Sequence, residues 1–171
     1  TVFPSMQWLR ATNVLCAAGI VAALVSAWTH ARRAIGSGGL EAPATKRNIG
    51  SMVAVGLLTA AFLACFVSVW NRYIEVNHFP SQTMSEVLTV FNGCLLASML
   101  VLHFVLRLHD KGPGWAVLND ALHLLVFGGV IAISYHIGTQ STAQRDLPPA
   151  LQSYWFAPHI LALVTSYAML G

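Results

Sequence analysis

The chain has 171 residues, of which 56% are hydrophobic and only 9% are charged, and its mean hydropathy is +0.65. Soluble proteins carry roughly 25% charged residues, so this composition excludes an ordinary soluble enzyme and indicates an integral membrane protein. The net charge of +3 is too small, and too divided among the loops, to indicate a nucleic-acid partner.

Four complete apolar segments approach the roughly 20 residues that a helix needs to cross the bilayer hydrocarbon. They lie at residues 12–29, 51–70, 87–108 and 116–137. A fifth segment, residues 154–171, stops at the last residue of the sequence. We therefore expect an all-α polytopic bundle that forms one transmembrane domain over residues 1–171, with a truncated fifth span. The first residue is Thr1, and no signal-peptide pattern follows it, so we expect a trimmed or processed start.

Basic residues predict which loops face the cytoplasm, because short loops rich in Lys and Arg tend to stay there. Six of the nine lie in or beside loops 30–50 and 109–114, which we expect to be cytoplasmic. The N-terminus, loop 71–86 and loop 138–153 hold the other three and are expected outside. Cys16, Cys65 and Cys94 lie singly in separate spans and form no CxxC pair, which favours a packing role.

Two histidines on consecutive predicted spans, His103 and His123, lie at comparable distances from the turn between those spans. They are candidates to face one another and hold a haem inside the membrane, because ionisable groups within spans are functional hypotheses by default. The alternative is structural: Asp120 precedes His123 by one turn and is a candidate partner for it.

The segment LPPALQSYWFAPHILALVTSYAML, residues 147–170, places a histidine at the mouth of the fifth span. A helix that starts near Tyr154 puts Pro158 in or just after the first turn, whereas one that starts at Pro148 is kinked there. In both cases Trp155 lies one turn before His159. Spacing alone leaves two readings open: an interfacial histidine that only packs, or a metal or haem ligand.

This segment resembles the stretch around the first external histidine of the CcsA (ResC) family, the System II cytochrome c biogenesis proteins. The matching positions are Pro149, Ala150, Leu151, Gln152, Ser153, Trp155, His159, Ser166 and Tyr167. A second stretch, NRYIEVNHFPSQTMSEVLTVF, is similar to the family's Arg, Gly-His-x-Pro and Tyr-Glu-Ser region. It matches at Arg72, His78, Pro80, Glu86 and Phe91, and departs at Asn77, Thr83 and Ser85.

The resemblance covers about residues 71–170 and implies a partial chain, because the family's tryptophan-rich WWD segment and second external histidine are absent. It implies export of haem b and its attachment to an apocytochrome c with a CxxCH motif, as part of a haem-lyase complex with a CcsB (ResB)-like partner. The membrane would be a bacterial cytoplasmic membrane or its thylakoid equivalent. His159 corresponds to an axial iron ligand, while Trp155, Glu86 and Arg72 are candidate haem-pocket residues.

Two other functions remain open on the residues alone. One is a membrane cytochrome b that passes electrons to or from a quinol through a haem between His103 and His123. The other is a scaffold subunit that carries no cofactor.

Overall fold

The computed structural model describes residues 4–36, 49–81, 83–107, 111, 113–139 and 155–170. Within these ranges the chain forms five α-helices and no strand. The helices are α1 (Pro4–Gly36), α2 (Ile49–Val76), α3 (Met84–Leu106), α4 (Pro113–Gly138) and α5 (Phe156–Leu170). The first four are long and apolar enough to cross a membrane. The predicted all-α polytopic fold class is therefore confirmed.

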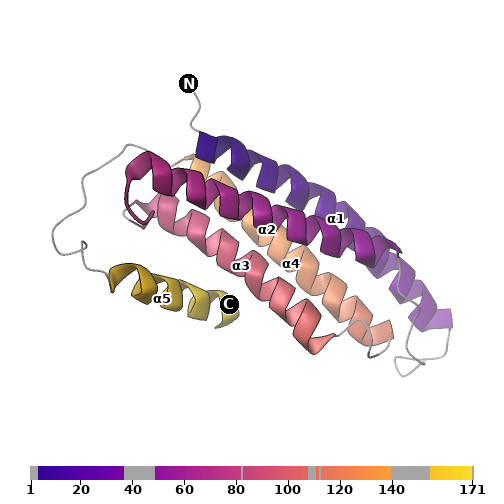
Figure 1. Ribbon diagram of the computed structural model, residues 1–171. Coiled ribbons are helices and arrows are strands. Elements are labelled where there is room, and N and C mark those ends of the chain that lie inside the picture. The colour runs from indigo at the N-terminus through magenta and orange to yellow at the C-terminus, as the bar shows by residue number, and fades with distance from the viewer. Residues whose placement is uncertain are drawn as a thin grey trace.

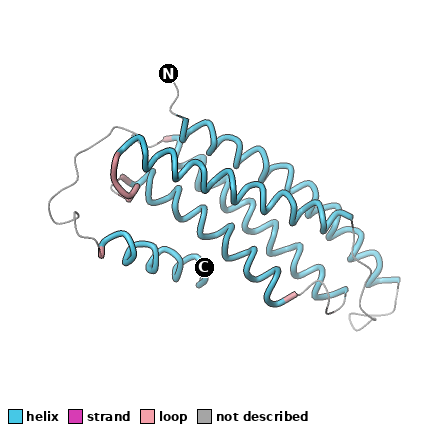
Figure 2. The backbone as a smooth tube through the Cα atoms, in the orientation of Figure 1, coloured by secondary structure: helices cyan, strands magenta, loops and turns pink. Residues whose placement is uncertain are grey.

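The four long helices lie side by side in an antiparallel bundle, and the shorter α5 lies against α3 (Figure 1). Contacts join α1 to α2 and α4, and join α3 to the same two helices, so the four close into a ring. Figure 2 shows the described loop between α2 and α3 at one end of this ring. We call this end the Arg72 end; it also holds the starts of α1 and α5 and the end of α4. The opposite end, with the end of α1 and the start of α4, is called the His30 end.

Helices extend beyond the apolar segments that predicted them. The first apolar segment covers residues 12–29, whereas α1 has 33 residues from Pro4 to Gly36. Hydropathy marks only the part that lies in hydrocarbon, but the hydrogen-bonded backbone continues into the interfacial layer. Ser5 of α1 and Glu75 of α2 lie in such extensions and contact one another.

Small residues let the helices approach one another in the core. A Cβ atom added to Gly19 of α1 would lie 2.6 Å from the ring of Phe127 in α4, so only glycine fits there. The buried core cluster draws on all four long helices and consists of Cys16, Leu58, Ala61, Cys65, Leu96, Met99, Phe127 and Val130. Both buried cysteines thus occupy packing positions, and Cys94 is partly buried.

The α2–α3 connection is a tight turn built by two local signals. Asn77 adopts the left-handed conformation with φ 56°, and its N–H donates to the Tyr73 carbonyl over 2.9 Å, which closes α2. Thr83 is the N-cap of α3 and forms a capping box with Glu86. The turn therefore fixes the position of Glu86 relative to the last turns of α2.

Candidate functional site

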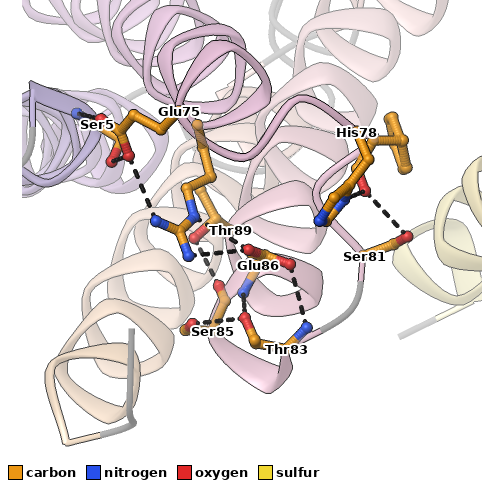
Figure 3. Close-up of polar contacts among 10 residues, drawn as sticks. Ser5, Glu75, His78, Ser81, Thr83, Ser85, Glu86 and Thr89 are labelled. Carbon is orange, nitrogen blue, oxygen red and sulfur yellow. Dashed lines mark hydrogen bonds and ion pairs between the residues drawn. The ribbon is translucent and has the colours of Figure 1, made fainter. Parts of the chain in front are cut away.

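An ion-pair network at the Arg72 end joins two helices across this turn. The Arg72 guanidinium donates through Nε and Nη2 to Glu86 Oε1, over 3.0 Å in each case. Its Nη1 lies 3.4 Å from Glu75 Oε2. Figure 3 shows the side chains of Glu75 and Glu86, which both take part in this network. One buried cation is thus shared by two acidic side chains.

The same network ties the start of α1 to α2. Glu75 accepts hydrogen bonds from the Ser5 backbone N–H at 3.1 Å and from the Ser5 hydroxyl at 2.9 Å. The Ser68 hydroxyl donates to the Ser5 carbonyl over 2.7 Å. A carboxylate beside the first N–H groups of a helix is favoured by the helix dipole. The sequence analysis singled out neither Ser5 nor Glu75, because their contact spans 70 residues of sequence.

Both carboxylate oxygens of Glu86 make contacts within the protein. The side chain is 3% exposed, and Oε2 accepts from the Thr83 N–H over 3.1 Å while Oε1 faces Arg72. A small cavity of about 30 Å³ lies beside Arg72 and Glu86, which is comparable with the space of one water molecule. In this structure the Arg72–Glu86 pair is therefore engaged in contacts within the protein.

His78 is oriented by the turn itself. Its Nδ1 lies 3.0 Å from the Phe79 carbonyl oxygen, which accepts, so Nδ1 carries the proton. The same carbonyl accepts from the Ser81 hydroxyl over 3.4 Å (Figure 3). Nε2 then holds the lone pair, and among the described residues it has no hydrogen-bond partner although it is buried. The turn thus fixes one tautomer of this imidazole.

His159 lies on α5, and Trp155 directly precedes this helix. The helix begins at Phe156, and the His159 N–H donates to the Trp155 carbonyl over 3.1 Å. Pro158 therefore lies in the first turn, as in the first of the two predicted arrangements. Both functional candidates are exposed, Trp155 at 80%.

Contacts with α3 hold α5 in place further along its length. Val164 is 6% exposed, and the Cys94 Sγ lies 3.6 Å from the Thr165 hydroxyl. His159, in the first turn, is exposed. The structure thus pairs two predicted site residues, Arg72 and Glu86, and puts the other two in and just before the first turn of α5, at the same end of the bundle.

At the other end the two intramembrane histidines meet. The rings of His103 and His123 are 1% exposed each, with centroids 5.6 Å apart in an edge contact. Asn119, one turn before His123 on α4, contacts both rings: its side-chain oxygen is 3.4 Å from His103 Nδ1, and its backbone carbonyl oxygen is 2.8 Å from His123 Nδ1. The predicted proximity is present. A porphyrin between the rings would replace their contact and require α3 and α4 to move apart.

The partner of Asp120 differs from the one suggested by sequence. Asp120 Oδ2 lies 2.9 Å from Nδ1 of His30 in α1, and both side chains are buried. His123 instead contacts the carbonyl of Asn119. The reason is geometric: residues three apart on a helix diverge by about 60°, which lets Asp120 face α1 while His123 faces α3. No group of three or more metal-ligating side chains occurs among the described residues.

Comparison with known proteins finds three relatives, each named cytochrome c biogenesis protein CcsA. The Chlorella vulgaris protein is 28% identical over 99 residues, which cover 58% of this chain and 29% of that protein. The Prochlorococcus marinus protein is 25% identical over 123 residues, covering 72% and 37%. The Gloeobacter violaceus protein is 30% identical over 115 residues, covering 67% and 29%.

The chain thus spans about a third of the length of the curated relatives that it matches. No family model and no solved structure matches it. The three relatives bear the name of the family that residues 71–91 and 147–170 resemble. Four apolar helices, the motifs on the α2–α3 turn and α5, and these three matches place the chain in the CcsA family of cytochrome c biogenesis proteins.

Proposed function

We propose that the chain acts in cytochrome c biogenesis by presenting haem b on the external side of the membrane, with His159 as an axial ligand of the iron. The observation that carries this proposal is the position of His159: an exposed imidazole in the first turn of α5, at the Arg72 end. The positive-inside rule favours placing this end outside. The similarity to three CcsA proteins supports a role in cytochrome c biogenesis.

His159 suits the role of an iron ligand that holds haem temporarily, before the haem is transferred to the apocytochrome. Neutral imidazole is a common metal ligand, and an exposed ring can approach an iron atom without displacing core side chains. The buried side chain of Val164 and the contact from Cys94 hold α5 against α3, so the His159 imidazole lies on a helix with a fixed position. Trp155, one turn earlier and exposed, can cover one face of a porphyrin.

Haem is the substrate in this scheme. Each cysteine thiol of the CxxCH motif adds across a haem vinyl group: a C–S bond and a C–H bond form, the S–H bond and the vinyl π-bond are lost, and no net oxidation occurs. The histidine of the CxxCH motif then replaces one protein ligand on the iron. A ligand at the exposed mouth of a helix suits this exchange better than one in the bundle core.

Arg72 and Glu86 serve this site indirectly in the proposal. A haem propionate would have to compete with two carboxylates for the Arg72 guanidinium, which is 11% exposed. We therefore assign the pair to holding the α2–α3 turn and the start of α1 in place beneath the external surface. A CcsB (ResB)-like membrane protein and the apocytochrome are the proposed partners, in a bacterial cytoplasmic or thylakoid-type membrane.

The test is an absorption spectrum of the purified protein, loaded with haem in detergent. His159→Ala should lose the Soret band of protein-bound haem, whereas His136→Ala, which removes an exposed histidine at the same end, should keep it. Loss of the signal with His103→Ala or His123→Ala alone would instead support the membrane cytochrome b. Absence of haem from the wild type and all variants would favour the scaffold.

A further inference from the structure

The charged side chains of the described residues are distributed unevenly between the two ends of the bundle. Two basic and two acidic residues lie at the Arg72 end: Arg10, Arg72, Glu75 and Glu86. Four basic residues and one acidic residue lie at the His30 end: Arg32, Arg33, Arg107, Lys111 and Asp120. Asp120 is buried against His30. The surface of the His30 end is therefore strongly cationic.

Two of these cations stand over exposed tryptophan rings. The Arg32 guanidinium carbon lies 4.5 Å from the ring centroid of Trp28, and the Lys111 ammonium lies 5.7 Å from that of Trp115. Trp28 is 60% exposed and Trp115 is 49% exposed. In each pair the cation and the tryptophan are four residues apart in sequence. A cation over an aromatic face is held without losing its charge.

Both pairs lie at one membrane boundary. The contact between His30 and Asp120 sets the register of the antiparallel helices α1 and α4. Trp28 is two residues before His30, and Trp115 is five before Asp120. At about 1.5 Å per residue, the two tryptophans lie roughly 10 Å apart along the bundle axis. That separation is comparable with the depth of the interfacial layer, where tryptophan rings are favoured.

We propose that the His30 end binds the headgroups of anionic phospholipids, with Arg32 and Lys111 at the lipid phosphates and Trp28 and Trp115 at the boundary with the acyl chains. Charge complementarity favours an anionic lipid, since the exposed charged side chains among the described residues of this end are all basic. The exposed apolar side chains of Leu24 and Val25, one turn before Trp28, provide the lipid-facing surface below the headgroups. This proposal does not depend on haem binding.

The test uses the whole chain in nanodiscs that contain phosphatidylcholine and a minor fraction of phosphatidylglycerol. Either lipid is brominated in its acyl chains, and quenching of tryptophan fluorescence reports which lipid lies next to the protein. Brominated phosphatidylglycerol should quench more strongly than brominated phosphatidylcholine at equal mole fraction. Each membrane-surface cation contributes roughly a fivefold preference at low salt, so Arg32→Gln/Lys111→Gln should lower the preference at least fivefold.

The matched control is Arg10→Gln, which removes an exposed cation from the opposite end and should leave the preference unchanged. Equal quenching by the two lipids in the wild type would overturn the proposal. So would a preference that survives in Arg32→Gln/Lys111→Gln, or one that falls equally in Arg10→Gln. Binding of soluble polyglutamate to the detergent-solubilised protein, without a lipid preference, would point to an acidic protein partner instead.

Discussion

Removing the charge of Arg72 should destabilise the protein strongly, because it leaves two carboxylates without their cation. Glu86 is 3% and Glu75 is 16% exposed at the side chain, so water screens neither of them well. Breaking a buried ion pair by removing one partner costs about 3–5 kcal/mol. We expect Arg72→Gln to lower the free energy of unfolding by this amount.

Substitutions that keep part of the network should cause smaller losses of stability than Arg72→Gln. Arg72→Lys retains the charge but replaces a planar fork of donors with a single ammonium. It loses the paired Nε and Nη2 contacts to Glu86 and should cost of order 1–2 kcal/mol. Arg10 is exposed, so the control Arg10→Gln should change stability by less than about 0.5 kcal/mol.

The assay is equilibrium unfolding by sodium dodecyl sulfate in mixed micelles, followed by far-UV circular dichroism. The double variant Arg72→Gln/Glu86→Gln should recover part of the loss, because it removes the carboxylate that Arg72→Gln leaves buried alone. A loss below about 1 kcal/mol for Arg72→Gln, or an equal loss for Arg72→Gln and Arg10→Gln, would refute the reasoning.

Two further predictions concern the bundle itself. Asp120→Leu alone should cost about 1–3 kcal/mol by leaving the buried Nδ1 of His30 without its partner, and His30→Leu/Asp120→Leu should restore most of it; additive losses in the same unfolding assay would contradict a coupled pair. Gly19→Ala should lower the free energy of unfolding by about 1–3 kcal/mol, because its Cβ would lie 2.6 Å from the Phe127 ring. The control Gly56→Ala places its Cβ in open space and should be neutral or stabilising by up to about 1 kcal/mol. Equal effects of the two substitutions would disprove close packing of α1 on α4.

Local patterns in the sequence predict the helices well. Long apolar segments define four spans because an isolated backbone in lipid has to satisfy its own hydrogen bonds. The N-cap of α3 follows from Thr83 and Glu86 at capping-box spacing. The ends of α1 are less predictable, since hydropathy carries no signal for helical residues beyond the hydrocarbon.

Long-range polar contacts could not be predicted in the same way. Sequence marks Arg72 and Glu86 as neighbours of one loop, but their pairing depends on the left-handed conformation of Asn77 and the tight turn that follows. The contact between Asp120 and His30 joins residues 90 apart, and helix spacing alone pointed to His123. Such contacts depend on which helix faces which, and that is set by the packing of the whole bundle.

Chemical rescue tests the proposed iron ligand most directly. His159→Gly removes the imidazole and leaves space at the first turn of α5, where free imidazole can enter. If His159 binds the iron, the variant should lose the Soret band of protein-bound haem and regain it when millimolar imidazole is added during haem loading. A Soret band that persists in His159→Gly without imidazole would contradict the account, since another group would then hold the iron.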